Sequence, residues 1–80
     1  MQEPVITCEL HAAFCRNMRT RRTELGMTQQ ELAEAIGLYQ PDISAFEAGL
    51  KEPTLKTVSL IAKGLRIRPE ALFLLEPALA

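Results

Sequence analysis

The sequence predicts an all-α fold, a compact bundle of five short helices. Apolar residues recur at three- and four-residue spacing along most of the chain, residues that cap helices precede three of the segments, and glycines or prolines separate them. With 80 residues, 48% of them hydrophobic, the chain can form one domain with a small core and has no room for a second.

The first helix is predicted over residues 8–25, after an N-terminal arm of residues 1–6. Thr7 is the expected N-cap, and Gly26 supplies the C-terminal stop. One stripe of this helix consists of positions spaced by three or four residues: Leu10, Phe14, Met18, Arg22 and Leu25. An arginine within an apolar stripe requires a negatively charged partner.

The second helix is predicted to begin at Gln29, directly after a capping box. In this box the Thr28 hydroxyl and the Glu31 carboxylate each satisfy a backbone N–H that the helix start leaves free. The helix is expected to end at Gly37, which suits a left-handed position. Its expected inward residues are Leu32, Ala33 and Ile36.

The third helix is predicted over residues 40–48, after a short turn. At about 100° per residue, Ile43 and Phe46 point inward. The opposite surface is short and nearly uncharged and consists of Gln40, Pro41, Ser44 and Ala45. Because proline lacks an N–H and favours the first helical position, we expect Gln40 to act as the N-cap. The second and third helices together have the form of a helix-turn-helix.

A fourth helix is expected from its N-cap Thr54 to Lys63, and a fifth from Pro69 to about Leu75, ended by Pro77. The expected inward residues of the fourth helix are Leu55, Val58, Ile61, Ala62 and Leu65. The fifth helix is apolar on all sides, and Leu60 lies away from the core face of the fourth.

Such a surplus of apolar residues usually marks an association surface. We therefore expect a two-fold symmetric dimer through the C-terminal helix with help from the fourth. The expected interface residues are Leu60, Leu72, Phe73, Leu74, Leu75 and Leu79. The alternative is that the C-terminal helix only covers the core of a monomer. It would then bury Leu72 and Phe73 but leave Leu74 or Leu75 exposed.

The cysteines and the single histidine do not form a recognisable site. Cys8 and Cys15 would lie about 10 Å apart on one helix, too far for a disulfide. With His11 they offer three ligands where structural zinc takes four, so we predict two buried or half-buried thiols and neither metal nor cofactor. No nucleophile, base and orienting group can be assembled around His11, so no enzyme is predicted.

Two further properties bear on partners and location. The longest apolar run, residues 71–75, is far shorter than the roughly 20 residues that span a membrane, and no signal peptide is recognisable. We expect a cytoplasmic protein without a membrane partner. The net charge of −1 argues against nucleic acid, but four of the nine basic residues lie close together: Arg16, Arg19, Arg21 and Arg22.

Four motifs occur in order: GMTQQELA at 26–33, ISAFEAG at 43–49, PTL at 53–55 and IAKGL at 61–65. With them the chain closely resembles the Cro and phage-repressor (XRE-like) family of helix-turn-helix regulators over about residues 14–74. The resemblance implies a lambda-repressor-like fold. It also implies a DNA-binding domain over residues 7–76, which includes the dimerisation helix, and a tail over 77–80.

The resemblance further implies that the third helix enters the major groove of double-stranded DNA. Base reading would fall to Gln40, Pro41, Asp42, Ser44 and Ala45, with Pro41 and Ala45 suited to thymine methyl groups. Asp42 either accepts from cytosine N4 or complements the helix dipole. Phosphate contacts are expected from Thr28, Gln29, Tyr39, Lys51, Thr54, Arg22 and Arg19.

Some of these positions have simpler interpretations. In the family, the residue at Gln29 binds a phosphate and braces the one at Gln40, although both could be ordinary solvated residues. Lys51 could equally be a solvated loop residue. Arg22 matches an arginine that, in the family, pairs with a glutamate at the position of Glu47. We expect this ion pair to be mainly architectural.

The predicted function is a non-enzymatic transcriptional regulator that binds a pseudo-palindromic operator as a homodimer and controls its own promoter. It resembles stand-alone Cro-like regulators and restriction-modification controller proteins. RNA polymerase is a further candidate partner, and no small-molecule effector is expected. The alternative is an antitoxin-type protein-interaction module, which would bind a toxin and, secondarily, DNA.

Overall fold

The computed structural model describes residue 6 and residues 8–75. Within them it contains four α-helices and one 3₁₀ helix: α1 Glu9–Glu24, α2 Gln29–Ile36, α3 Gln40–Glu47, α4 Leu55–Gly64 and η1 Pro69–Phe73. The all-α prediction is confirmed, as are the capping box of α2 and the cap of α4 by Thr54. The N-cap of α1 is Cys8 and not Thr7, so that prediction is wrong. The predictions for Leu79, for the tail and, apart from residue 6, for the arm fall outside the described residues. No helix among the described residues could span a membrane.

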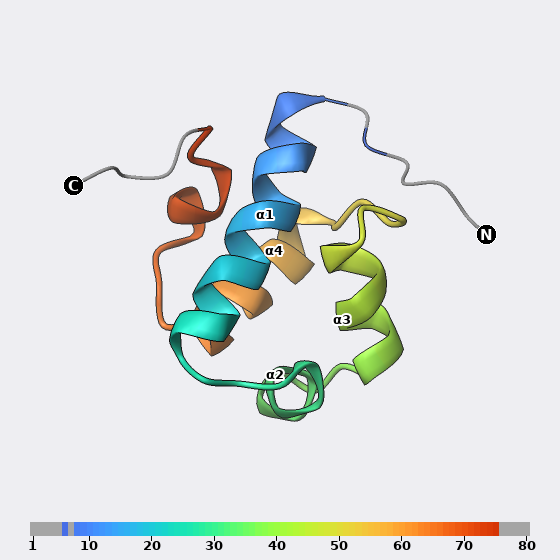
Figure 1. Ribbon diagram of the computed structural model, residues 1–80, viewed down its shortest axis with the longest axis vertical. Coiled ribbons are helices and arrows are strands. Elements are labelled where there is room, and N and C mark those ends of the chain that lie inside the picture. The colour runs from blue at the N-terminus through green and yellow to red at the C-terminus, as the bar shows by residue number, and fades with distance from the viewer. Residues whose placement is uncertain (1–5, 7, 76–80) are drawn as a thin grey trace.

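Helix α1 crosses the domain in front of α4, with α3 on one side and η1 on the other (Figure 1). It packs against both α3 and η1, and α2 packs against α3 and α4. Phe14 of α1 connects the two sides, because its ring meets Phe46 edge-on at 6.2 Å and stacks on Phe73 at 6.1 Å. The largest fully buried side chains are Phe14, Met18, Leu32, Ile43, Ile61, Leu65 and Leu72.

Three residues expected inside the domain are exposed. Leu10 is 52% and Leu55 86% exposed, and Cys8 is an exposed N-cap while Cys15 is buried. Leu10 and Leu55 lie in the first turn of their helices. Because side chains lean toward the N-terminus of a helix, they point past the end of the packed region. The predicted apolar stripes are correct in the helix interiors and wrong at these helix starts.

The prediction of a fifth α-helix to Leu75 is wrong. η1 ends at Phe73, and Leu74 is extended. Side chains of α1 take carbonyl groups at the end of η1 and after it: Asn17 donates to Leu72 O at 3.0 Å and Leu74 O at 2.9 Å, and Arg16 donates to Leu75 O at 2.7 Å. These bonds hold the segment against α1 in a conformation that an α-helix could not adopt.

The C-terminal leucines therefore divide between the domain core and its surface. Leu72 is fully buried and Phe73 stacks on Phe14, so Leu72 is not available to a partner. Leu74 and Leu75 are each 50% exposed. Leu60, expected on the surface, is half-buried and lines a groove beside Ala35 and Gly64.

Candidate nucleic-acid interface

The turn between α2 and α3 is defined by local backbone chemistry. Thr28 Oγ1 accepts from the N–H of Glu31 at 3.0 Å, and Glu31 Oε1 accepts from the N–H of Thr28 at 2.8 Å. At the other end Gly37 adopts φ 74°, a left-handed conformation that glycine accommodates without strain. The sequence predicts both features, and both are confirmed.

Helix α3 begins one residue earlier than predicted. The carbonyl of Tyr39 accepts from the N–H of Asp42 at 2.9 Å, so Tyr39 is the N-cap and Gln40 the first helical residue. Pro41 at the second position removes no helical hydrogen bond, since the first four N–H groups of a helix have no partner within it. Gln40 is thus free to use its side chain outside the helix start.

Four side chains from three helices form one connected cluster, which we call the amide–carboxylate network: Arg22, Gln29, Gln40 and Glu47. Gln40 Nε2 donates to Gln29 Oε1 at 2.7 Å, and Gln29 Nε2 donates to Glu47 Oε1 at 3.1 Å. Arg22 binds both carboxylate oxygens of Glu47, through Nε at 2.6 Å and Nη2 at 3.0 Å. The network connects α1 to the first residue of α3.

Glu47 is the centre of this network and its side chain is fully buried. Burial raises the pKa of its carboxyl, but the hydrogen bonds from Arg22 and Gln29 outweigh that effect and hold the pKa below its ordinary value of 4.5. The same bond to Glu47 raises the pKa of Arg22. A buried carboxylate with several donors remains ionised and held in one orientation.

The arginines of α1 face two different ways. Arg19 Nε lies 3.4 Å from Glu47, and the Arg19 side chain is 59% exposed beside α3. Arg22 is only 12% exposed and also donates to Met27 O at 2.7 Å. Arg16 and Arg21 instead bind carbonyls of the C-terminal half, at Leu74, Leu75 and Leu65. Four arginines that are close in sequence therefore do not form one basic patch.

The loop after α3 is tied to α3 through Lys51. Its Nζ lies 3.2 Å from Asp42 Oδ1 and 5.2 Å from the ring centre of Phe46. His11 of α1 approaches the backbone, with its Nε2 3.3 Å from Lys51 O. The structure thus places Lys51 beside Asp42 and next to the outer surface of α3. Asp42 has a partner that the sequence did not indicate.

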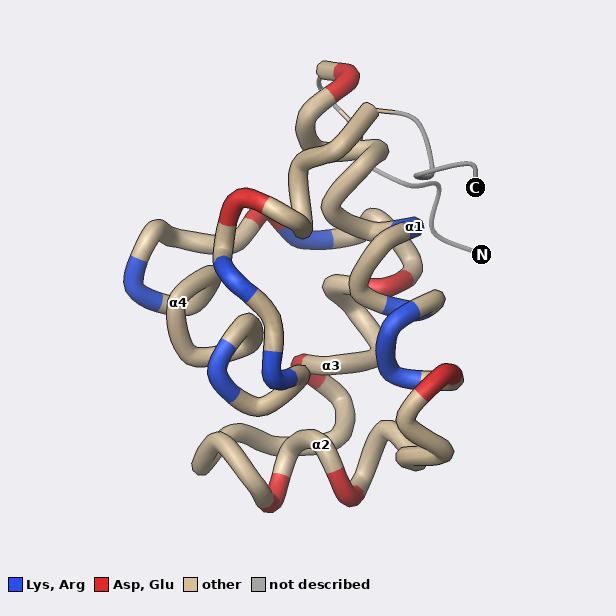
Figure 2. The backbone as a smooth tube through the Cα atoms, turned by 90° about the vertical axis from the view of Figure 1, so that its left-hand side faces the viewer, with Lys and Arg blue, Asp and Glu red and all other residues tan. Residues whose placement is uncertain are grey.

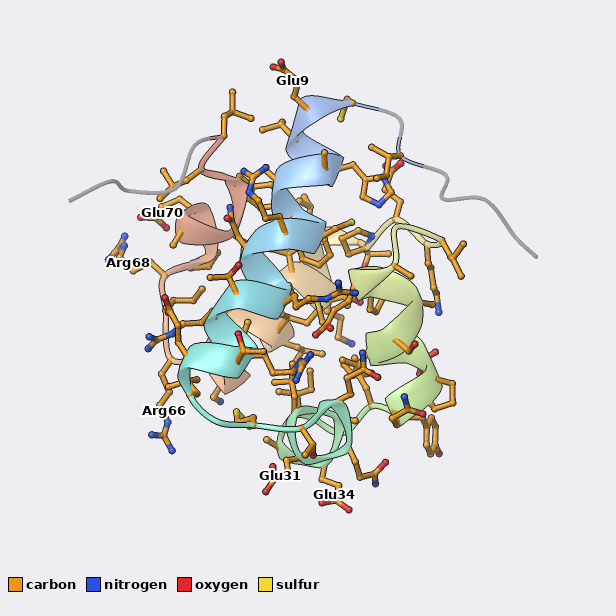
Figure 3. The ribbon with its side chains drawn as sticks, viewed as in Figure 1. Glu9, Glu31, Glu34, Arg66, Arg68 and Glu70 are labelled. Carbon is orange, nitrogen blue, oxygen red and sulfur yellow. The ribbon has the colours of Figure 1, made fainter. Side chains whose placement is uncertain are left out.

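Charge is unevenly distributed over the domain. Helix α2 carries acidic residues and no lysine or arginine, whereas basic residues lie on α1, on α4 and after it (Figure 2). Glu31 and Glu34 point outward from α2 (Figure 3). The acidic outer side of α2 is therefore unfavourable for contact with phosphate groups.

Sequence reasoning missed three sets of contacts. The bond from Gln29 to Glu47 and the pair of Lys51 with Asp42 each join residues from different helices or loops, and no short-range pattern marks them. The same holds for the bonds from Asn17 to carbonyls at the end of η1 and after it.

A family model described as helix-turn-helix matches residues 18–72. The chain belongs to the helix-turn-helix family. Members of this XRE/Cro-like family are DNA-binding transcriptional regulators and not enzymes, so the predicted family and the non-enzymatic class are confirmed.

Two curated relatives show how the family assignment extends along the chain. A helix-turn-helix regulator of Methanothermobacter thermautotrophicus is 42% identical over 60 residues, which cover 74% of this chain and 87% of the relative. One of Mycobacterium tuberculosis is 35% identical over 65 residues, which cover 76% of this chain and 46% of the relative. This helix-turn-helix protein thus spans about half the length of the mycobacterial regulator.

Solved structures of restriction-modification controller proteins share the fold. C.AhdI from Aeromonas hydrophila superposes with a TM-score of 0.75 and 30% identity, covering 79% of this chain and 96% of C.AhdI. C.Esp1396I was crystallised as a tetramer with its natural 35 base-pair operator. It superposes with a TM-score of 0.76 and 31% identity, covering 84% of this chain and 88% of C.Esp1396I. The helix-turn-helix protein is similar to both.

Proposed function

We propose that this helix-turn-helix regulator binds a pseudo-palindromic operator as a homodimer and controls its own promoter. The observation that carries the proposal is the outer face of α3, whose first residue, Gln40, is held in place by Gln29 at 2.7 Å. A similar protein, C.Esp1396I, forms a complex with its operator. Two α3 helices about 34 Å apart would enter successive major grooves.

The proposed base readers are the accessible residues of α3. Gln40 and Ser44 supply polar contacts, and Pro41 and Ala45 supply apolar contacts suited to thymine methyl groups. Asp42 is engaged with Lys51, which supports a role in orienting that lysine over one in reading cytosine. With few polar readers, sequence-dependent DNA shape would supply part of the specificity.

Phosphate contacts are proposed on both flanks of α3. Gln29 and Thr28 lie at the start of α2, and Tyr39 is 78% exposed beside α3. Lys51 lies in the loop after α3, and Thr54 is the N-cap of α4. Arg19 is accessible next to Glu47. Arg22 has three nitrogens bound to Glu47 and Met27, and this favours the architectural role.

The proposed dimer surface is smaller than the sequence suggested. Leu74 and Leu75 are half exposed on the C-terminal segment, next to a hollow of about 170 Å³ bordered by Glu9, Ala12 and Arg16. A second copy would cover these leucines and remove apolar surface from water.

Footprinting on DNA upstream of the chain's own gene tests the proposal. Protection of two half-sites one helical turn apart is expected, and no protection at low salt would contradict it. Gln40→Ala with Ser44→Ala should lower the preference for the protected site over unrelated DNA, and an unchanged preference would contradict base reading by α3. Ser59→Ala, an exposed serine of α4, is the matched control and should leave the preference unchanged.

A further inference from the structure

We infer that Glu47 is a specificity-determining positioning residue, which acts through Gln29 and sets which side-chain atoms Gln40 presents to the DNA. The inference rests on the proposed base-reading role of Gln40. Glu47 itself is fully buried and cannot touch a base. Its effect must therefore be transmitted through the hydrogen bonds of the amide–carboxylate network.

The orientation of each amide follows from the chemistry of its neighbour. A carboxylate only accepts hydrogen bonds, so Gln29 must turn its Nε2 toward Glu47, at 3.1 Å. Its Oε1 then faces Gln40, and because this oxygen also only accepts, Gln40 must turn its own Nε2 toward it, at 2.7 Å. The buried charge thus determines the orientation of both amides.

Glu47 is itself unable to rotate. Arg22 holds its two oxygens at 2.6 Å and 3.0 Å, a two-point contact that fixes the plane of the carboxylate. Reversal of Gln29 would place an amide oxygen against this carboxylate and leave a donor without its acceptor. The orientation is therefore established before any DNA binds.

The exposed edge of Gln40 follows from this arrangement. Its Oε1 accepts no hydrogen bond from the described residues, and one hydrogen of its Nε2 remains free. Together they present an acceptor next to a donor, the pattern that complements the N6 amino group and N7 of adenine in the major groove. A reversed amide would offer two hydrogens and would suit the acceptors O6 and N7 of guanine. Glu47 therefore favours adenine over guanine at the base that Gln40 faces.

The test compares binding of the full chain to duplexes that carry A·T or G·C at that base pair. A DNA site is first selected from random duplexes with the wild-type protein. The base pair that Gln40 faces is then the one at which Gln40→Ala removes a preference for A over G. Glu47→Gln replaces the carboxylate with a group that can either donate or accept. Glu34→Gln is the matched control, because Glu34 also accepts from a glutamine, Gln30, but is exposed and outside the network.

Wild type and Glu34→Gln should favour A·T by about tenfold or more. Glu47→Gln should lower that ratio at least fivefold, an order-of-magnitude expectation from the value of a two-point base contact. Its affinity for unrelated duplex should not fall, because both substitutions remove one negative charge that repels phosphate. A merely structural role would instead weaken binding to all duplexes together.

Gln29→Met provides a second route if Glu47→Gln does not fold, since it leaves the pair of Arg22 and Glu47 intact. It should lower affinity for every duplex by removing a phosphate contact and should also lower the A-over-G ratio. Folded Glu47→Gln and Gln29→Met proteins that both retain the wild-type ratio would overturn the inference alone. If Gln40→Ala removes no A-over-G preference at any position of the site, the proposed base reading by Gln40 is overturned as well.

Discussion

Helix α1 binds two regions of the molecule by two different kinds of hydrogen bond. Toward α3, Arg22 pairs with the buried carboxylate of Glu47. Toward the C-terminal segment, Asn17 and Arg16 donate to backbone carbonyls at the end of η1 and after it. Every residue has a backbone carbonyl, so the second arrangement holds the path of the chain without specifying its side chains. The first depends on particular side chains and can therefore orient the surface of α3.

The largest expected effect comes from removing the carboxylate of the first region. Glu47→Ala should lower the free energy of unfolding by about 3–5 kcal/mol, because it leaves the charge of Arg22 buried without a partner. Glu70→Ala is the control: Glu70 pairs with Arg68 at the same 2.6 Å but is exposed, and should give no measurable change. Urea unfolding measures both, and equal effects would contradict the role assigned to burial.

Acid should lower the free energy of unfolding less than Glu47→Ala does, because a protonated Glu47 still forms hydrogen bonds. The folded protein holds the pKa of Glu47 below the 4.5 of the unfolded chain. The stabilisation is therefore complete above pH 4.5 and is lost as the pH falls through the lower pKa of the folded state. Urea unfolding at a series of pH values should show this decline in the wild type. In Glu47→Gln the decline should be shallower, and identical slopes would contradict the assignment.

A smaller effect is expected from the C-terminal region. Asn17→Ala should lower the free energy of unfolding by about 1–2 kcal/mol. The half-buried amide donates to several carbonyls, and in the variant water reaches these carbonyls only in part. Gln30→Ala, on the exposed side of α2, is a suitable control with little change expected. The measurement is thermal unfolding, and a loss as large as that of Glu47→Ala would remove the contrast between the two regions.

The smallest effect is expected from Arg16→Ala. The bonds from Arg16 to Leu74 O and Leu75 O are exposed, and water can replace the guanidinium, so the cost should be below about 1 kcal/mol. Hydrogen exchange of the amides in η1 should nevertheless become faster, since the segment loses one of its anchors. Unchanged exchange would show that Asn17 alone holds the segment.

Much of the fold was predictable because its signals are local. The box of Thr28 and Glu31, the left-handed Gly37 and the cap at Thr54 each act within a few residues, and each is where the sequence indicated. Errors arose where the outcome depends on distant neighbours. Leu55 matched the inward stripe of α4 yet lies beyond the packed region, and Pro69 began a helix that side chains of α1 then ended early.

The candidate site shows the same division. Helical rotation indicated the outer face of α3, and the resemblance paired Gln29 with Gln40 and Arg22 with Glu47. Nothing in the sequence joined those two pairs. The bond from Gln29 to Glu47 exists because α1, α2 and α3 meet around one buried carboxylate.

The sequence by itself determined where α2 begins and ends, where α4 begins and which family the chain belongs to, because caps, glycines and apolar spacing act over short distances. Only the tertiary structure decided that Glu47 receives donors from α1 and α2 and that Leu72 completes the core. A buried charge and a closed core both require groups from far along the chain, and their positions are known only once the helices have packed.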